Sequence, residues 1–211
     1  MNKEEFIEEL KKININPTEK QLNQLDSYYK LLVEWNKKIN LTRIIEEEEV
    51  YLKHFYDSLT INKVIDLNKV KTMCDVGTGA GFPGIVIKII FPNIKTTLID
   101  SLQKRVNYLN EVIKELKLND IKAIHVRGED YKETFDLVTS RAVANIEKLV
   151  KYTMHLVKKD GTFIGMKGNI EEELTQNVRK ELEKKYIIEK IEYFELPKEQ
   201  SKRSLIIIKN K

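Results

Sequence analysis

The stretch from Cys74 to Gly84, Cys-Asp-Val-Gly-Thr-Gly-Ala-Gly-Phe-Pro-Gly, decides the fold. It holds four of the chain's 8 glycines, directly after an apolar segment that contains Asp75. Glycine loses the most backbone freedom on folding, so such a cluster is typical of a turn that needs positive φ or of a close ligand approach. The stretch therefore predicts a ligand-binding turn between a strand and a helix.

Strand-like and helix-like segments alternate from this turn onward. Strands are predicted over 72–76, 96–100, 123–126, 135–140, 162–166, 187–194 and 205–209, with helical stretches such as 102–116 and 170–184 between them. This alternation predicts an α/β fold with a mostly parallel, seven-stranded sheet and helices on both faces. Only a turn around Pro197 separates the last two strands, which predicts an antiparallel hairpin at one edge.

The first 66 residues read as a helical extension, and residues 67–211 as a Rossmann-like domain. Thr18 and Gln21 fit a capping box, which marks a helix start. The helix that follows carries one apolar stripe, which we expect to pack on the main domain rather than to bind a cofactor. Its members are Leu22, Leu25, Tyr28, Tyr29, Leu32 and Trp35.

Composition limits the classes of protein and partner. At 211 residues, with 41% hydrophobic and 33% charged residues, the chain fits one medium domain plus a small extension. Its net charge of +4 is modest, so any anionic partner must meet a local basic patch. The single Cys74 excludes an intramolecular disulfide and a cysteine metal cluster; we expect it to fill the core in a reducing compartment.

The amino-terminal segment MNKEEFIEELKK carries charges every few residues and holds no long apolar stretch. It is therefore neither a signal peptide nor a membrane anchor. We expect a cytoplasmic monomer without a metal site and without a membrane partner.

Two ligands compete for the glycine turn. Gly79 to Gly84 satisfies G-x-G-x-x-G, and Asp100 follows at the ribose-binding distance, which leaves a nicotinamide enzyme open. Asp75 argues against it, because a carboxylate beside the loop repels a pyrophosphate and favours a cationic ligand. S-adenosyl-L-methionine is such a ligand, and Asp100 at a strand end could accept hydrogen bonds from its ribose.

The loop after the fourth predicted strand, residues 139–144, should face the acceptor. It lacks the Asn/Asp-Pro-Pro-aromatic pattern of exocyclic-amine methyltransferases, and Cys74 lies too early to attack a pyrimidine ring. A ring nitrogen such as guanine N7 has a free lone pair, so methylation there needs positioning and no catalytic base. We accordingly assign no catalytic residue. Arg141 could bind the methionine carboxylate or the guanine edge, or form a structural ion pair.

The sequence resembles the bacterial 16S ribosomal RNA guanine-N7 methyltransferases, the glucose-inhibited division protein B family, along nearly its whole length. The resemblance implies a class I S-adenosylmethionine-dependent methyltransferase fold. It also implies methyl transfer to one guanine in the decoding-region loop, with 16S rRNA or the small ribosomal subunit as partner. It rests on Trp35 to Thr42, His54 to Leu59, Asp75 to Gly84, Asp100-Ser101 with Lys104-Arg105, Ser140 to Ala144, and Met166 to Gly168.

The candidate site residues combine this resemblance with the strand-end argument. The family more often has Ala where Gly128 stands, a departure that leaves a main-chain contact intact. His54 and Asp57 lie one helical turn apart, and we favour a core histidine over a catalytic one. The cofactor candidates are Gly77, Gly79, Phe82, Asp100, Gly128, Glu129 and Arg141, and the RNA candidates are Asn40, Lys104, Arg105, Lys167 and Arg203.

Three alternatives stay open at this stage. The protein could methylate another RNA, a protein or a small molecule. It could be an NAD-binding oxidoreductase, on the glycine pattern alone. It could also be an RNA-binding module that kept the fold without activity, since fold does not imply function.

Overall fold

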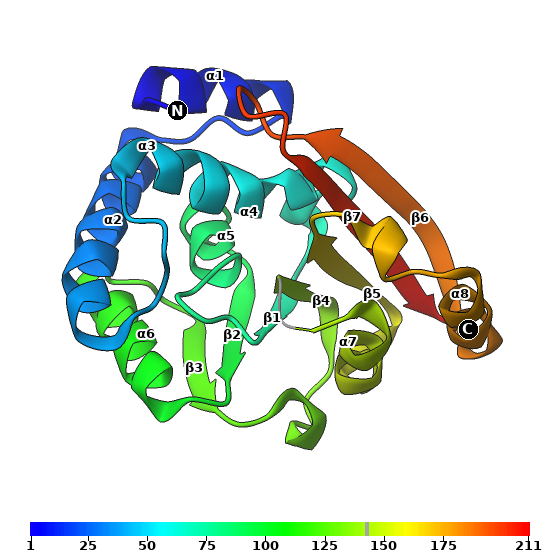
Figure 1. The fold of residues 1–211 in the computed structure, drawn as a ribbon. Helices are drawn as coiled ribbons and strands as arrows, with labels where there is room; N and C mark the ends of the chain where they lie inside the picture. Colours follow the sequence, from blue (N-terminus) through cyan, green and yellow to red (C-terminus); the bar gives the residue numbers. More distant parts are fainter. Residues whose placement is uncertain (142–143) are drawn as a thin grey trace.

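The computed structural model describes residues 1–141 and 144–211. Its seven-stranded sheet has the order β3-β2-β1-β4-β5-β7-β6 (Figure 1). Strands β3, β2, β1, β4 and β5 run parallel to one another, and β7 pairs antiparallel with both β5 and β6. The predicted sheet and its antiparallel edge hairpin are confirmed. The strands are β1 (Thr72–Val76), β2 (Lys95–Asp100), β3 (Ile121–His125), β4 (Phe135–Arg141), β5 (Val157–Lys167), β6 (Tyr186–Glu195) and β7 (Lys202–Asn210).

The helices also follow the predicted alternation, with one boundary moved. The stretch expected over 170–184 opens with a separate 3₁₀ turn, and α8 begins only at Gln176 because the Thr175 side chain caps it by accepting from the Val178 amide. The α-helices are α1 (Lys3–Lys12), α2 (Glu19–Ile39), α3 (Glu47–Val50), α4 (Asp57–Leu59), α5 (Gly84–Ile90), α6 (Gln103–Glu115), α7 (Ile146–Thr153) and α8 (Gln176–Lys185). A π-helical turn, Tyr51–Tyr56, joins α3 to α4, and 3₁₀ turns cover Thr60–Lys63, Leu67–Lys69, Gly128–Asp130, Met154–Leu156 and Ile170–Glu172.

The core forms two apolar layers, one on each face of the sheet. Successive side chains of a strand point to opposite faces. Met73 accordingly belongs to the layer that contains α5 and α6, whereas Cys74 and Val76 belong to the layer that contains α7. Cys74 is a fully buried free thiol, so the expected core role is confirmed.

The N-terminal helices curve around α5 and α6 (Figure 1). Leu25, Tyr28 and Leu32 of the predicted stripe are fully buried, and the capping box at the start of α2 is present. The Gln21 amide donates to the carbonyls of Ile89 and Ile90, at the end of α5. The stripe therefore packs on the main domain as predicted. The boundary between residues 66 and 67 stays a proposal.

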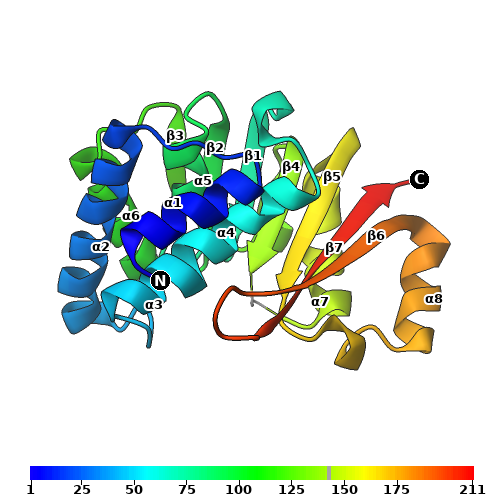
Figure 2. The same ribbon diagram turned by 90° about the horizontal axis from the view of Figure 1, so that it is seen from above.

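The turn between β6 and β7 reaches back to the N-terminal helices (Figure 2). Lys198 pairs with Glu5 of α1, and Glu199 lies 2.8 Å from the ammonium of Lys53. These pairs bring the start of β7, and with it Arg203, against α4. Within the described ranges, none of the helices has the length and apolar character needed to cross a bilayer.

Candidate functional site

Two adjoining cavities lie at the carboxyl ends of the parallel strands, where ligands bind in open α/β sheets. The larger has a volume of about 580 Å³ and the smaller about 290 Å³. Both are lined by Gly77, Asp100 and Ser101. Of the predicted cofactor residues, Gly79, Phe82 and Arg141 line only the larger cavity, whereas Gly128 and Glu129 line only the smaller one. All seven candidates thus line one or both of two cavities that share three residues.

The glycine turn is held by main-chain bonds to β2. Gly77 and Gly79 have φ of 69° and 59°, which glycine adopts without a Cβ penalty. The amides of Gly77 and Thr78 donate to the carbonyl of Ile99, at 2.8 and 3.1 Å. Pro83 stands at the N-cap of α5, and the helix begins at Gly84.

Asp75 does not face the cavities. Its carboxylate is fully buried, and one oxygen accepts from the Thr78 hydroxyl at 2.6 Å and from the Gly84 amide at 2.8 Å. The other oxygen has no hydrogen-bond partner among the described residues, and burial raises the pKa of this carboxyl to about 6. The expectation that Asp75 meets a cationic ligand is therefore wrong. The strand alternation that places Met73 beneath α5 also places Asp75 there, where it anchors the loop.

Asp100 lies between the two cavities, at the end of β2. It accepts from the amides of Gly79 at 3.0 Å and Leu102 at 2.9 Å, and Arg105 approaches it at 3.4 Å. A carboxylate has about four acceptor sites, so these bonds fix its orientation without using its whole capacity. Asp100 therefore lines both cavities with acceptor capacity left, and its role in ligand binding stays a prediction.

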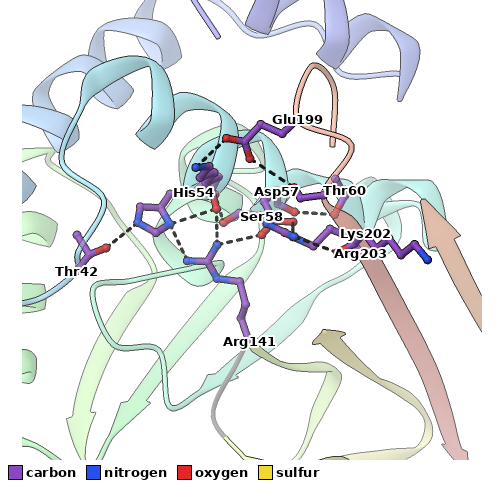
Figure 3. Close-up of polar contacts among 11 residues, drawn as sticks. Thr42, His54, Asp57, Ser58, Thr60, Arg141, Glu199, Lys202 and Arg203 are labelled. Atoms are coloured by element: carbon purple, nitrogen blue, oxygen red, sulfur yellow. Dashed lines mark hydrogen bonds and ion pairs between the residues drawn. The ribbon is translucent and has the colours of Figure 1, made fainter. Parts of the chain in front are cut away.

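Arg141, at the end of β4, is the centre of a polar cluster (Figure 3). Its guanidinium donates to the Lys53 carbonyl at 2.9 Å and pairs with Asp57 at 3.2 Å. The same group lies 5.1 Å from the centre of the Phe82 ring, a cation–π contact. Arg141 forms the structural ion pair that was considered and also lines the larger cavity.

His54 packs beneath Arg141 in a neutral state. Its ring stacks on Phe82 with centroids 4.3 Å apart, and Nδ1 lies 3.1 Å from the Arg141 guanidinium. Nδ1 also lies 3.2 Å from the Lys53 carbonyl, and Nε2 lies 2.9 Å from the Thr42 hydroxyl. Burial, with the nearby Arg141 charge, lowers the pKa of His54 to about 3. His54 is 7% exposed and also lines the larger cavity, so its burial fits the favoured core histidine and the choice against a catalytic one stays a prediction.

The buried neutral state of His54 predicts a pH-dependent stability. The unfolded chain protonates this imidazole below about pH 6.5, whereas the native protein does so only near the lowered pKa. Between these values the free energy of unfolding should fall with decreasing pH, by up to about 1.4 kcal/mol per pH unit for this group. His54→Gln should flatten the profile measured by urea denaturation from pH 7 to 4.5. His125→Gln, at an exposed position that ends β3, is the matched control; parallel profiles for wild type and His54→Gln would contradict the assignment.

Asp57 joins two arginines at the wall of the larger cavity. Its second oxygen lies 3.3 Å from Arg203 of β7, while the first holds Arg141. The carboxylate is 5% exposed, and the Asp57 carbonyl accepts from the Thr60 hydroxyl. Asp57 therefore positions two guanidinium groups from different strands. The sequence offered only its one-turn spacing from His54 as a signal.

The predicted RNA-contacting residues divide into two groups. Arg105, Lys167 and Arg203 line the larger cavity, and its described lining does not include Asn40 or Lys104. Asn40 is the C-cap of α2, with φ 48°, and Lys104 is exposed on α6. Their role in RNA binding stays a prediction.

Lys167 is more buried than a phosphate-contacting lysine normally is. Its ammonium donates to the Ala144 carbonyl and lies 2.8 Å from Glu173. This charge is therefore already paired. Ala142 and Val143, which belong to the predicted acceptor-facing loop, lie outside the described residues. The described chain holds no group of three or more His, Cys, Asp or Glu side chains arranged to bind a metal.

Gly128 lies directly against β1. A Cβ at this position would come within 2.8 Å of Cγ1 of Val76. Glycine is therefore the residue that fits beside this valine, and the main chain stays at the wall of the smaller cavity.

Comparisons with known proteins show which family the sequence matches. The family model described as GidB, rRNA small subunit methyltransferase G, matches residues 21–206. The ribosomal RNA small subunit methyltransferase G of Bacillus pumilus (strain SAFR-032) is 45% identical over 219 residues, covering 100% of this chain and 91% of its own. That of Macrococcus caseolyticus (strain JCSC5402) is 49% identical over 173 residues, covering 80% and 73%.

Solved structures share the fold at low identity. The ribosomal protein L11 methylase of Lactobacillus delbrueckii subsp. bulgaricus superposes with a TM-score of 0.57 at 18% identity, over 79% of this chain and 80% of that one. The B. subtilis M1A22 tRNA methyltransferase TrmK gives a TM-score of 0.57 at 12% identity, over 76% and 68%. The predicted Rossmann-like methyltransferase architecture is confirmed.

Proposed function

The chain belongs to the GidB family of rRNA small subunit methyltransferases G, and we propose that it transfers a methyl group from S-adenosyl-L-methionine to N7 of a guanine in 16S rRNA. The observation that carries this function is the pair of cavities joined at Gly77 and Asp100. A nucleoside with an amino-acid arm needs such a bipartite space, and an acceptor base needs room beside it.

The residues around the cavities fit this donor. We assign the adenine to the smaller cavity, beside Gly128 and Glu129, and the ribose hydroxyls to Asp100, which has acceptor capacity left. We assign the methionine arm to the wall from Gly77 to Phe82. When bound, the donor supplies an electrophilic methyl group on a sulfonium.

The reaction requires alignment of the methyl donor with the acceptor nitrogen more than it requires proton transfer. Guanine N7 has a free lone pair at neutral pH, so the protein must hold it in line with the methyl–sulfur bond. His54 is neutral and its two ring nitrogens face Arg141 and Thr42, so we give it no acid–base role. We assign to Arg141 a fork of hydrogen bonds to the methionine carboxylate or to the guanine N7/O6 edge.

A methylation assay tests the function. The protein is incubated with methyl-labelled donor and small ribosomal subunits from cells that lack this methylation, and the labelled position is mapped. We expect label on N7 of one guanine in the decoding region. Label on another RNA, on a protein or on a small molecule, together with unlabelled 16S rRNA, would contradict 16S rRNA as the substrate and identify the labelled molecule instead.

We also predict that Asp100→Ala weakens cofactor binding. Loss of a buried hydrogen-bonding carboxylate should cost about 1–3 kcal/mol, or roughly 5- to 150-fold in affinity. Calorimetric titration with S-adenosylhomocysteine measures this. Asp130→Ala, an exposed acid in the turn that contains Glu129, is the matched control. An unchanged dissociation constant for Asp100→Ala would remove Asp100 from the cofactor site.

The finer features of the working enzyme are proposals too. We propose that it acts as a monomer in the cytoplasm, on the rRNA or on an assembled small subunit. Analytical ultracentrifugation at assay concentration tests the monomer; a stable dimer would exclude it.

A further inference from the structure

A third cavity borders the larger one toward the edge of the sheet. Its volume is about 380 Å³, and it lies between the end of β5 and the hairpin strands. Gly168, Phe194 and Arg203 line both this cavity and the larger one. The two cavities therefore share part of their lining, so a nucleic-acid strand at the larger cavity passes close to the third one.

Tyr193 is the distinctive residue of this third cavity. It lies on β6, the last strand in the sheet order, and is 53% exposed, the highest value among the large hydrophobic side chains of the described ranges. An exposed aromatic ring in the wall of a cavity is a platform on which a nucleic-acid base stacks, whatever its identity. The ligand that fits such a ring is one with a flat face, such as a nucleic-acid base.

Two basic residues of the neighbouring strand line the third cavity from opposite faces of the hairpin, Lys202 on the face of Tyr193 and Arg203 on the other. Lys202 and Arg203 pair across the hairpin with Glu195 and Phe194, and both line the third cavity. Figure 3 shows Lys202 pointing away from the Asp57 cluster, whereas Arg203 is held by Asp57. A phosphate at the border of the two cavities would meet Lys202 on the Tyr193 side of the hairpin and Arg203 on the other side.

Two carboxylates, Glu171 and Glu195, also line the third cavity. They repel a phosphate that enters its interior, so they direct the phosphate to Lys202 and Arg203. Toward a base they act differently, because a carboxylate accepts hydrogen bonds from exocyclic amino groups. The charge distribution thus favours a nucleotide with its base inside and its phosphate at the border.

We propose that this cavity, the Tyr193 pocket, binds the nucleotide next to the methylated guanine, with its base stacked on Tyr193. The inference rests on the proposed function. A guanine that enters the larger cavity must leave its stack, and enzymes read such bases from single-stranded segments. The adjacent base then loses a stacking partner, and Tyr193 replaces it.

Site-directed crosslinking locates the occupant. The photoreactive amino acid p-benzoylphenylalanine is placed at position 193, and at position 187 as a control on the same strand, where Ile187 is also exposed. Small subunits lacking the methyl group are the probe. We expect a crosslink from position 193 to a nucleotide adjacent to the target guanine and none there from position 187. A crosslink to a ribosomal protein, to a distant nucleotide, or to neither would overturn the proposal.

Steady-state methylation gives the energetic test. Tyr193→Ala should raise KM for small subunits about tenfold, within the range of base–aromatic stacking, and leave kcat and the KM for S-adenosylmethionine unchanged. Tyr193→Phe, which keeps the ring, should restore KM, and Ile187→Ala should match wild type. Equal KM values for Tyr193→Ala and wild type would overturn the pocket alone. Failure of the wild-type protein to methylate rRNA would instead reject the proposed function.

Discussion

Arg141→Ala is expected to lower kcat for methylation about 100-fold, the loss that follows when a positioning group releases its substrate by about 1 Å. Arg141 lines the larger cavity, covers Phe82 and holds Asp57. Its removal therefore takes away a hydrogen-bonding fork and loosens the wall around the methyl donor.

The variant should stay folded, because Asp57 keeps its second partner, Arg203. Single-turnover methylation and far-UV circular dichroism measure the two properties separately. Arg141→Lys keeps the charge without the planar fork. We therefore expect its thermal stability to be closer to that of the wild type than its methylation rate is. Arg179→Ala, an exposed arginine of α8, is the matched control. Turnover at the wild-type rate in Arg141→Ala would remove this residue from the site.

Gly81→Ala should be strongly destabilising. Gly81 has φ +99°, and a Cβ there would lie 2.5 Å from the Tyr28 hydroxyl and 2.6 Å from Cγ1 of Ile85. Neither neighbour is free to move: both are fully buried, and the Tyr28 hydroxyl donates to the Ala80 carbonyl at 2.5 Å. Backbone strain and overpacking together should cost about 3–4 kcal/mol.

Thermal unfolding measures this cost, and for a chain of this length we expect Tm to fall by about 10 °C. Gly168→Ala is the matched control, since no atom lies within 4 Å of its added Cβ and its φ is outside the left-handed region. We expect this control to stay within about 0.5 kcal/mol of wild type. A Gly81→Ala protein as stable as Gly168→Ala would show that the loop is less constrained than its contacts indicate.

The Tyr28 contact explains why the N-terminal helices matter for the site. Tyr28 belongs to α2, and its hydroxyl holds the glycine turn by donating to the Ala80 carbonyl. His54, from the π-helical turn, stacks on Phe82 of the same turn. The extension thus shapes the wall of the larger cavity rather than only covering α5.

Local patterns were enough to predict the sheet. Each of the seven predicted strands is present, and most of their bounds agree within a few residues. The largest difference is in β5, which begins at Val157, five residues before the predicted start. The hairpin of β6 and β7 followed from the short connection at Pro197. The start of α8 was misplaced because Thr175 competes as an N-cap. A π-helical turn leaves no simple periodicity and was not predicted.

The site was harder to predict, because its decisive contacts join distant parts of the chain. Asp57 bonds to Arg141 and Arg203, and nothing in the local sequence pairs these residues. The orientation of Asp75 was predictable in principle: alternation along β1 places it on the face of Met73. Because that carboxylate is buried, charge at the loop no longer distinguishes a methyl donor from a dinucleotide, and family membership makes the distinction.

A crystal structure with bound S-adenosylhomocysteine tests the assignment of the cofactor site most directly. The predicted result has the adenine beside Gly128 and Glu129, the ribose hydroxyls on Asp100, and the amino-acid arm along the glycine turn toward Arg141. Density for the product at any other place on the protein, with these two cavities free of it, would contradict the account.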